Sequence, residues 1–324
     1  MIMSTSDLTP LLNDLLSGAC GEEDGARFLL QLRQRGETPQ ELATLVRRLA
    51  SEARPLSTKH STILDLCGTG GASFRTFNVS TIAALVASAR FPVAKHGNRS
   101  LNGLCGSADM LSVLGADIRC PSAVSSQALD DVGFCFLYAP DYHPTLARVA
   151  GARRQAASRT IFNLAGPLLN PVQAARRQLI GVGERRHLRT VAEACALLGI
   201  ERAMVVHGRP GMDEISASGP SLVMEVRNGS LDEYYVDPGQ LGMGYVFEES
   251  LRELPAQESA LLCHRILAGE KIPQRQAVVL NAAAALYVAG AAHSLEAGLG
   301  QAEAAIDSGR AAAQLQHYLD ICGA

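Results

Sequence analysis

The sequence predicts an α/β protein in which a small all-helical amino-terminal domain precedes a larger domain built on a mostly parallel central sheet. Two observations support this. Residues 7 to about 52 repeat apolar side chains three and four positions apart, as amphipathic helices do. From residue 63 onward, short apolar runs alternate with helical segments, which is typical of strand-helix-strand units. We therefore expect a helical domain over residues 1–60 and an α/β domain over residues 61–324.

The amino-terminal helices are expected in LTPLLNDLL, ARFLLQLRQRG and TPQELATLVRRLA. The third should begin at Thr38-Pro39, because threonine is a good N-cap and proline suits the first helical position. The tract SEARPLSTKHST is polar and contains proline, which favours a linker between the two domains.

In the larger domain, the run ILDLC stops at a cluster of glycines, as a buried parallel strand would. Further strands are expected over residues 92–94, 134–138, 178–182, 203–207 and 222–226. Helices are expected over residues 77–89, 107–114 and 189–198, and the chain after residue 248 should be helical to its end.

Composition excludes several classes of protein. The 324 residues are 47% hydrophobic and 19% charged, with a net charge of −3, so no global field attracts nucleic acid or an acidic membrane. No charge-free apolar run reaches bilayer length, and the first residues lack the pattern of a signal peptide. The eight cysteines are spread singly, without zinc spacing, which favours reduced thiols in the cytoplasm.

The stretch from Asp65 to Asp109 carries the strongest functional signal. A predicted strand runs into GTGG at 68–71, and NVST at 78–81 then opens a predicted helix. Glycines let backbone amides approach an anion, and a helix start adds unpaired N–H groups and the positive end of a dipole. Either motif alone would be explained by an ordinary turn or cap. Their combination favours a phosphate site, at which Ser80 could also bind a metal.

Lys95 follows the next predicted strand, in the run KHGNRS. Only three of the 29 basic residues are lysine, at positions 59, 95 and 271. In a chain that otherwise uses arginine, a lysine at a strand end suits a compact charge on a pyrophosphate oxygen. A solvated loop lysine is the alternative. His96 alone favours a structural role, and Asn98 after a glycine favours a turn.

Asp213 and Glu214 lie in the loop GRPGMDE, which follows the predicted strand AMVVH. Ligands of open α/β sheets bind at the carboxyl ends of strands, and two carboxylates there suit Mg²⁺ bridging a pyrophosphate. On the residues alone, a solvent-exposed turn explains the pair about equally well.

A third stretch runs from Tyr142 through RTIFNLAGPLLNP at 159–171. Arg153 is a candidate for holding a carboxylate, because a guanidinium binds that group through two hydrogen bonds. Arg154 and Arg159 compete for the same assignment. From the residues alone, the sequence predicts a pyrophosphate and metal site with one such arginine.

Together these stretches resemble the anthranilate phosphoribosyltransferases, a family of the nucleoside phosphorylase-like glycosyltransferase superfamily. GTGG, TFNVST, AKHGNRS, GSADMLSVLGA, YHP, RTIFNLAGPLLNP, GMDEIS and LNAAAALYVAG follow the family's order over most of the chain. The resemblance implies a nucleoside phosphorylase/phosphoribosyltransferase-like fold, whose helical domain is completed by an excursion near residues 145–178 and forms a homodimer. It implies an enzyme of tryptophan biosynthesis that uses Mg²⁺ to transfer the phosphoribosyl group of 5-phosphoribosyl 1-pyrophosphate (PRPP) to the amine of anthranilate.

The resemblance also assigns site residues by position. Donor-binding positions are Gly68, Gly71, Ala72, Thr76, Asn78, Val79, Ser80, Thr81, Lys95, His96, Gly97, Asn98 and Ser107. Acceptor-binding positions are Gly68, Asn98, His143, Arg153 and Pro167, with Arg153 on the anthranilate carboxylate. Lys95 and Arg153 are the catalytic candidates, and Ser80, Asp213 and Glu214 are the metal-binding candidates.

The chain departs from the family pattern where Ala72 and Ser73 replace the last two residues of the usual GTGGDG, and where 155–157 replace a Glu-Leu-Gly-like segment. Two other functions stay open. A pyrimidine nucleoside phosphorylase shares the fold but should carry a lysine-containing, Ser-rich first block, where this chain has Asp65-Leu66-Cys67. A non-catalytic, nucleic-acid-binding paralogue would need a basic groove, which the net charge does not favour.

Overall fold

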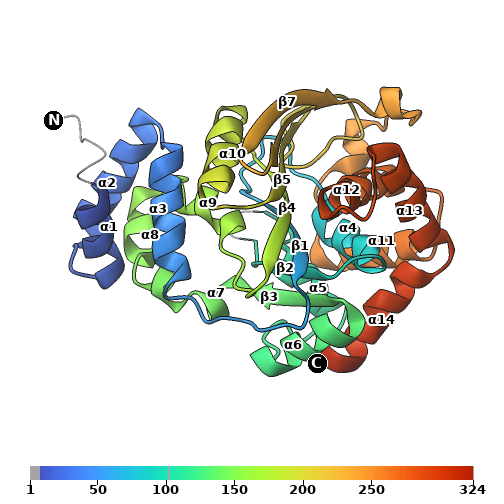
Figure 1. Ribbon diagram of the computed structural model, residues 1–324, viewed down its shortest axis with the longest axis horizontal. Helices are drawn as coiled ribbons and strands as arrows, with labels where there is room; N and C mark the ends of the chain where they lie inside the picture. The colour runs from blue at the N-terminus through green and yellow to red at the C-terminus, as the bar shows by residue number, and fades with distance from the viewer. Residues whose placement is uncertain (1–7, 101–102, 324) are drawn as a thin grey trace.

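A seven-stranded sheet with helices on both faces forms the centre of the protein (Figure 1). The computed structural model describes residues 8–100 and 103–323. The strand order is β3-β2-β1-β4-β5-β6-β7. The strands are β1 (Thr62–Gly68), β2 (Val93–Gly97), β3 (Phe134–Tyr138), β4 (Ala175–Gly181), β5 (Arg202–Gly208), β6 (Ser221–Arg227) and β7 (Ser230–Val236). The first five of these strands are parallel, whereas β6 and β7 are antiparallel, which confirms the expected mostly parallel sheet.

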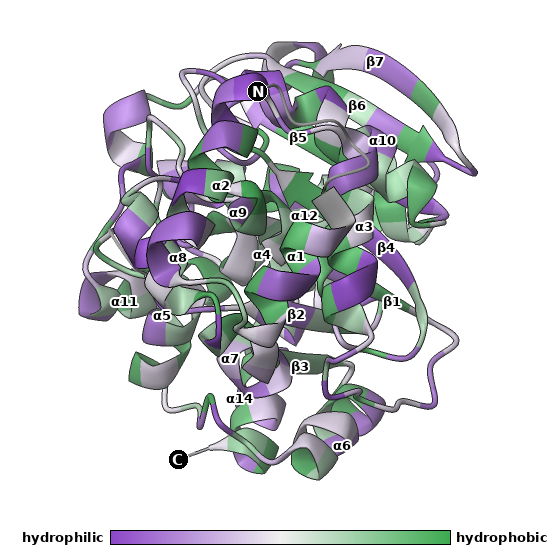
Figure 2. Ribbon diagram, turned by 90° about the vertical axis from the view of Figure 1, so that its left-hand side faces the viewer, coloured by the Kyte–Doolittle hydropathy of each residue, from purple (hydrophilic) through white to green (hydrophobic). Residues whose placement is uncertain are grey.

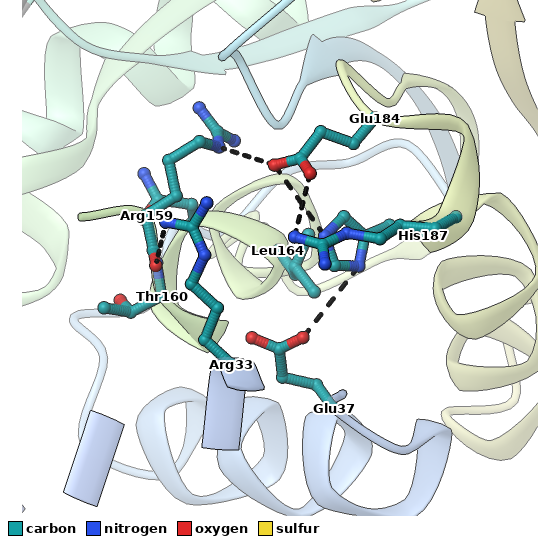
Figure 3. A pocket seen from close by; sticks show the side chains of 9 residues that line it. Arg33, Glu37, Arg159, Thr160, Leu164, Glu184 and His187 are labelled. Carbon is teal, nitrogen blue, oxygen red and sulfur yellow. Dashed lines mark hydrogen bonds and ion pairs between the residues drawn. The ribbon is translucent and has the colours of Figure 1, made fainter. Parts of the chain in front are cut away.

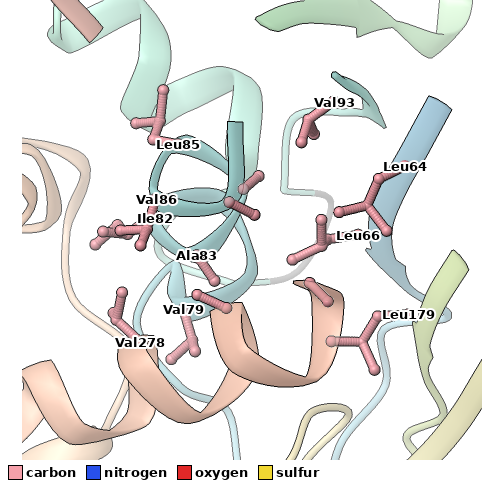
Figure 4. Close-up of a cluster of buried hydrophobic side chains, with 14 of the residues drawn as sticks. Leu64, Leu66, Val79, Ile82, Ala83, Leu85, Val86, Val93, Leu179 and Val278 are labelled. Atoms are coloured by element: carbon pink, nitrogen blue, oxygen red, sulfur yellow. The ribbon is translucent and has the colours of Figure 1, made fainter. Parts of the chain in front are cut away.

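One face of the sheet is covered by helices from the middle and the end of the chain. They are α4 (Val79–Ser88), α5 (Ser107–Val113), α6 (Ser122–Val132), α11 (Ala256–Leu267), α12 (Pro273–Ala289), α13 (Leu295–Asp307) and α14 (Arg310–Cys322). Figure 4 shows α4 beside α12, with the strands to one side, and side chains such as Ile82, Leu64 and Val278 fill the space between these elements. Because α4 is buried on nearly all sides, it is apolar all round rather than amphipathic.

The other face carries the amino-terminal helices and the segment that follows β3. They are α1 (Leu8–Ser17), α2 (Glu22–Arg35), α3 (Pro39–Ala50), α7 (Ala139–Tyr142), α8 (Ala150–Ala156), α9 (Ile161–Ala165) and α10 (Leu188–Leu197). Short 3₁₀ turns lie at Pro144–Ala147, Gly166–Leu168, Arg185–His187, Pro238–Leu241 and Glu248–Leu251. Figure 2 views the molecule from this end, with α1, α2, α3 and α8 in front of the sheet.

The predicted start of α3 is present in full. Thr38 accepts a hydrogen bond from the Glu41 amide at 3.2 Å, and the Glu41 carboxylate accepts one from the Thr38 amide at 2.9 Å. This reciprocal arrangement satisfies two donors that a helix start otherwise leaves unpaired.

A single apolar cluster joins the helical part to the sheet. It runs from Leu12 and Leu29 in the amino-terminal helices through Leu164 in α9 to Ile180 in β4 and Val205 in β5. The division at residue 60 therefore stays a prediction, because the helical part shares its core with one face of the sheet. The last residues of the predicted 145–178 excursion belong to the sheet, since β4 begins at Ala175.

Among the helices and strands, β7, α6 and the four-residue α7 were not expected from the sequence. β7 reads SLDEYYV and lies at the sheet edge with most side chains exposed, so it lacks the apolar run that marks an inner strand. α6 reads SAVSSQALDDV and buries only three side chains, which leaves a weak helical pattern. No helix among the described residues is long and apolar enough to cross a membrane.

Candidate active site

The glycine turn after β1 is tied to the end of β4. The Thr69 amide donates to the Gly181 carbonyl at 2.8 Å, and the Gly183 amide donates to the Thr69 hydroxyl at 3.1 Å. Gly70 and Gly71 have φ of +65° and +74°, a left-handed backbone that favours glycine. The turn is therefore fixed at the carboxyl ends of the two central strands, where ligands of such sheets bind.

The acidic loop after β5 packs directly against this turn. The Gly70 amide donates to Asp213 Oδ2 at 3.0 Å. A Cβ on Gly181 would lie 1.5 Å from the Asp213 carbonyl oxygen, and one on Gly68 would lie 2.7 Å from Asp213 Oδ2. Glycine at both positions is what allows the loop to approach the strand ends so closely.

Glu214 is buried beside Asp213 and is held by a second residue of the donor block. The Thr76 hydroxyl donates a hydrogen bond to Glu214 Oε1. Burial, with the neighbouring Asp213 charge, raises the pKa of Glu214 to about 8, and burial also raises the pKa of Asp213. Two adjacent carboxylates with raised pKa values fit a divalent cation, because its charge would favour their ionised forms.

Lys95 reaches this region from the middle of β2. It is 2% exposed, and its Nζ donates to the Leu66 carbonyl at 2.6 Å and to Ser80 Oγ at 3.3 Å. Burial lowers the pKa of Lys95, and the buried Asp65 carboxyl counters that effect. The ammonium thus lies between β1, which leads into the glycine turn, and the first turn of α4.

Of the four NVST residues at the start of α4, Ser80 is the one that contacts Lys95. The amides of Val79 and Thr81 donate to the carbonyls of Phe77, at 2.6 Å, and Asn78, at 3.1 Å. The Val79 side chain lies in the hydrophobic core, and Thr81 is 1% exposed. The Asn78 carboxamide accepts from Ser259 Oγ at 2.5 Å instead of capping the helix.

Three predicted donor residues meet at the end of β2. The Ser107 hydroxyl donates to the Asn98 carbonyl at 3.2 Å, and a Cβ on Gly97 would lie 2.4 Å from Ser107 Oγ. The glycine therefore lets the start of α5 approach the strand.

His96 and His143 form a buried edge-to-face pair with ring centroids 5.1 Å apart. His143 Nε2 lies 2.7 Å from the Leu169 carbonyl oxygen. Burial lowers the pKa of His96 to about 3 and also lowers that of His143. Both rings are neutral at pH 7 and serve as shape and hydrogen-bond partners rather than as cations. The carbonyl of Pro167 nearby accepts from Gln178 Nε2 at 2.8 Å.

Arg153 lies on α8 with its guanidinium 5.6 Å from the Phe162 ring centroid. Within residues 8–100 and 103–323, no carboxylate forms an ion pair with it, and burial lowers its pKa. Arg154 is exposed, whereas Arg159 points to the glycine turn. Of the three competing arginines, Arg153 has the unpaired, partly buried cation that a carboxylate ligand needs. Among the described residues, no hydrogen bond or ion pair joins Arg153 or Asn98 to Lys95 or Ser80.

Ala72 and Ser73 follow the two left-handed glycines of the turn. Ala72 is 8% exposed, and a Cβ on Gly183 would lie 2.5 Å from its amide nitrogen. A Cβ on Gly211 would lie 2.1 Å from Ser73 Oγ, so this hydroxyl packs onto the acidic loop.

Two supporting residues, Asn170 and Asp65, were missed by the sequence reasoning, and Arg159 was considered only for the acceptor. Asn170 Nδ2 donates to Asp65 Oδ2 at 2.9 Å and to the Ala94 carbonyl at 2.8 Å, while Asp65 Oδ1 accepts from the His96 amide at 3.3 Å. The signal was present in ILDLC, because a carboxylate inside an apolar strand must find partners. Nothing in the sequence indicated that Arg159, a candidate for the acceptor carboxylate, donates to the Thr69 carbonyl at 2.6 Å.

The chain is similar to known proteins over most of its length. The pattern of the glycosyl transferase family, a/b domain, matches residues 60–312. The anthranilate phosphoribosyltransferase of Moorella thermoacetica is 41% identical over 315 residues, covering 97% of this chain and 93% of that protein. The one from Rubrobacter xylanophilus is 41% identical over 324 residues, covering 98% and 93%.

Solved structures show the same likeness. The crystal structure of anthranilate phosphoribosyltransferase from Thermus thermophilus has a TM-score of 0.92 at 37% identity, covering 99% of this chain and 96% of that one. The Saccharomyces cerevisiae enzyme in complex with PRPP and Mg has a TM-score of 0.89 at 26% identity, covering 99% and 93%.

Proposed function

This chain belongs to the anthranilate phosphoribosyltransferases of the glycosyl transferase family, and from that premise we propose how its residues carry the transfer of a phosphoribosyl group from PRPP to the anthranilate amine. Two linked sets of contacts support the assignment most. Lys95 bonds Ser80 and the Leu66 carbonyl of the strand that leads into the glycine turn, and Asp213, beside Glu214, accepts from the Gly70 amide of that turn. These groups come from β2, α4 and the loop after β5, and they meet at the carboxyl edge of the sheet.

The reaction is a displacement at the anomeric carbon. The amine nitrogen forms the new bond to carbon as the bond to pyrophosphate breaks, with inversion and an oxocarbenium-like transition state, and the amine then loses a proton. Negative charge grows on the leaving pyrophosphate. We assign the stabilisation of that charge to Lys95 and to the glycine turn, whose Thr69 and Gly70 amides are already bonded within the protein.

Asp213, Glu214 and Ser80 supply hard oxygen ligands that fit Mg²⁺, which prefers one or two carboxylates together with substrate phosphates. When bound, the metal neutralises charge on the pyrophosphate. Thr76 orients Glu214 by its hydrogen bond, and the Gly70 amide orients Asp213. The protein's part is therefore to hold two carboxylates in one geometry.

The acceptor side needs positioning more than base catalysis, because an aromatic amine is already neutral at pH 7. We assign Arg153 to the anthranilate carboxylate, and Asn98, His143 and Pro167 to the path of the acceptor, as the family resemblance implies. Holding both reactants in one orientation supplies much of the acceleration.

The test is to mix the purified protein with PRPP, Mg²⁺ and anthranilate and to follow the loss of anthranilate fluorescence. We expect loss that requires both PRPP and Mg²⁺. Phosphorolysis of thymidine or uridine without consumption of anthranilate would instead identify a pyrimidine nucleoside phosphorylase. Salt-sensitive binding to single-stranded DNA without either activity would identify a nucleic-acid-binding paralogue.

We further propose that the enzyme is a cytoplasmic homodimer formed through its helical part. All eight cysteines are free thiols, as in a reducing compartment, and Leu30 on α2 is a large apolar side chain that is 41% exposed. Light scattering in solution should give twice the 34.3 kDa chain mass, and Leu30→Glu should shift it toward the monomer.

A further inference from the structure

A cationic side chain covers the glycine turn from the side of the helical segment. Arg159 lies between α8 and α9, and its Nη2 donates to the Thr69 carbonyl at 2.6 Å. A Cβ on Gly71 would lie 1.9 Å from Arg159 Nη1 and 2.2 Å from Cζ. The guanidinium therefore packs directly on the Gly71 backbone, in space that any other residue type would fill.

The guanidinium is held from a third direction by the α/β part of the molecule. Figure 3 shows Glu184, which follows β4, facing Arg159, with Oε1 4.0 Å from Arg159 Nε. Glu184 is itself fixed by Arg186, whose Nη2 lies 2.8 Å from Oε2. Arg33 on α2 donates to the Arg159 carbonyl at 3.2 Å, so the backbone of this residue is also anchored.

The charge of Arg159 also acts on the acidic loop. Burial is the main influence on the Asp213 pKa and raises it, while the Arg159 cation favours the ionised form and opposes that rise. Arg159 thus contacts the turn that should face the pyrophosphate, next to the Gly70 amide that donates to Asp213.

We infer that Arg159 is a positioning residue that fixes the Thr69–Gly71 turn for the pyrophosphate of the donor. This rests on the proposed function, because it deepens the role of the same turn. Its forked guanidinium meets Thr69, Gly71 and Glu184 together, which a lysine cannot do. Through the segment it shares with Arg153, it also links the acceptor-bearing helices to the donor loop.

The experiment compares Arg159→Ala and Arg159→Lys with the matched control Arg154→Ala, an exposed arginine of the same segment. Calorimetry with Mg²⁺ and pyrophosphate gives a Kd that does not depend on the acceptor. Steady-state rates give KM for PRPP and for anthranilate separately. Circular dichroism during heating shows whether each variant folds.

For Arg159→Ala we expect the pyrophosphate Kd and the PRPP KM to rise by about tenfold or more, with the anthranilate KM within about twofold. Arg159→Lys should recover only part of the affinity, and Arg154→Ala should match the unaltered enzyme. An unchanged pyrophosphate Kd, or equal rises in both KM values, would overturn the inference. If Arg159→Ala does not fold, the Arg159→Lys variant provides the test. A pyrophosphate Kd equal to that of the unaltered enzyme would then refute the role of the forked guanidinium.

The two proposals fail in different ways. Unaltered protein that binds pyrophosphate but does not consume anthranilate would overturn the assigned acceptor and leave the role of Arg159 intact. If the unaltered enzyme turns over normally and Arg159→Ala has the same pyrophosphate Kd and PRPP KM, only the inference about Arg159 is overturned.

Discussion

The ammonium nitrogen of Lys95 lies 3.3 Å from the hydroxyl of Ser80, on the first turn of the helix that follows the glycine strand. A lysine with 2% exposure keeps its charge at a cost in desolvation, because burial lowers its pKa. The buried Asp65 carboxyl offsets part of that cost. We propose that the leaving pyrophosphate binds beside this ammonium.

Replacing Lys95 by alanine should lower kcat by about 10²–10³-fold, because the variant loses a preorganised charge that acts on the leaving pyrophosphate. The matched control is Lys59→Ala, a lysine with 60% side-chain exposure and an ion-pair distance of 3.9 Å to Asp131. Initial rates at saturating PRPP and anthranilate measure the effect. Activity of Lys95→Ala within twofold of the unaltered enzyme would remove Lys95 from the machinery.

Substituting Arg153 by alanine should raise the KM for anthranilate about tenfold or more and leave the KM for PRPP nearly unchanged. Stability should change little, because no described carboxylate pairs with Arg153. Arg154→Ala serves as the control from the next position. An unchanged anthranilate KM in Arg153→Ala would contradict the proposal that Arg153 binds the anthranilate carboxylate.

Glu214 should make the stability of the magnesium-free protein depend on pH. Its folded-state pKa, about 8, lies above the ordinary value of 4.5. The stability that it contributes is therefore fully present below pH 4.5 and is lost as the pH rises through about 8. Urea unfolding in EDTA, compared at pH 5 and pH 9, should show less loss for Glu214→Gln than for the unaltered protein. Equal losses would show that Glu214 is not the group responsible.

Substituting Gly71 or Gly309 by alanine tests whether the Arg159 guanidinium must pack on the Gly71 backbone. Their φ values are +74° and +75°, but a Cβ on Gly309 would meet nothing within 4 Å, whereas one on Gly71 would overlap Arg159. Gly309→Ala should therefore cost only the left-handed strain, about 1–2 kcal/mol, without a change in PRPP KM. Gly71→Ala should add a rise in PRPP KM of about tenfold. Identical kinetics for the two variants would mean that Arg159 moves aside freely.

The Asp65–Asn170 pair should be a stability element. Asn170→Ala leaves a buried carboxylate and the Ala94 carbonyl without their donor, so unfolding free energy should fall by about 2–4 kcal/mol. Asn13→Ala, which removes an exposed amide 3.4 Å from Arg48 Nε, should change it by under about 0.5 kcal/mol. Urea titration of both variants at pH 7 provides the measurement; a loss below about 1 kcal/mol for Asn170→Ala would refute the prediction.

The strands that the sequence predicted well are those with buried, apolar side chains along their length. The predicted strand over residues 134–138 is β3 with both ends correct, and the other predicted strands lie within a few residues of their observed positions. Such strands are short apolar runs, several of them bounded by glycines, so their pattern is local. β7 escaped prediction because an exposed edge strand has no apolar run, and its place depends on pairing with β6.

The chemistry of the site followed from residue types along the chain: glycines for an anion, a rare lysine for a phosphate, adjacent carboxylates for a metal, and ordered blocks for the family. Which of three nearby arginines does what could not follow from the chain. Arg153, Arg154 and Arg159 share one segment and one chemistry, and only packing leaves the first unpaired, the second exposed and the third on Gly71. The physical reason is that a side chain's charge is a local property, whereas its burial and partners are set by elements far away in sequence.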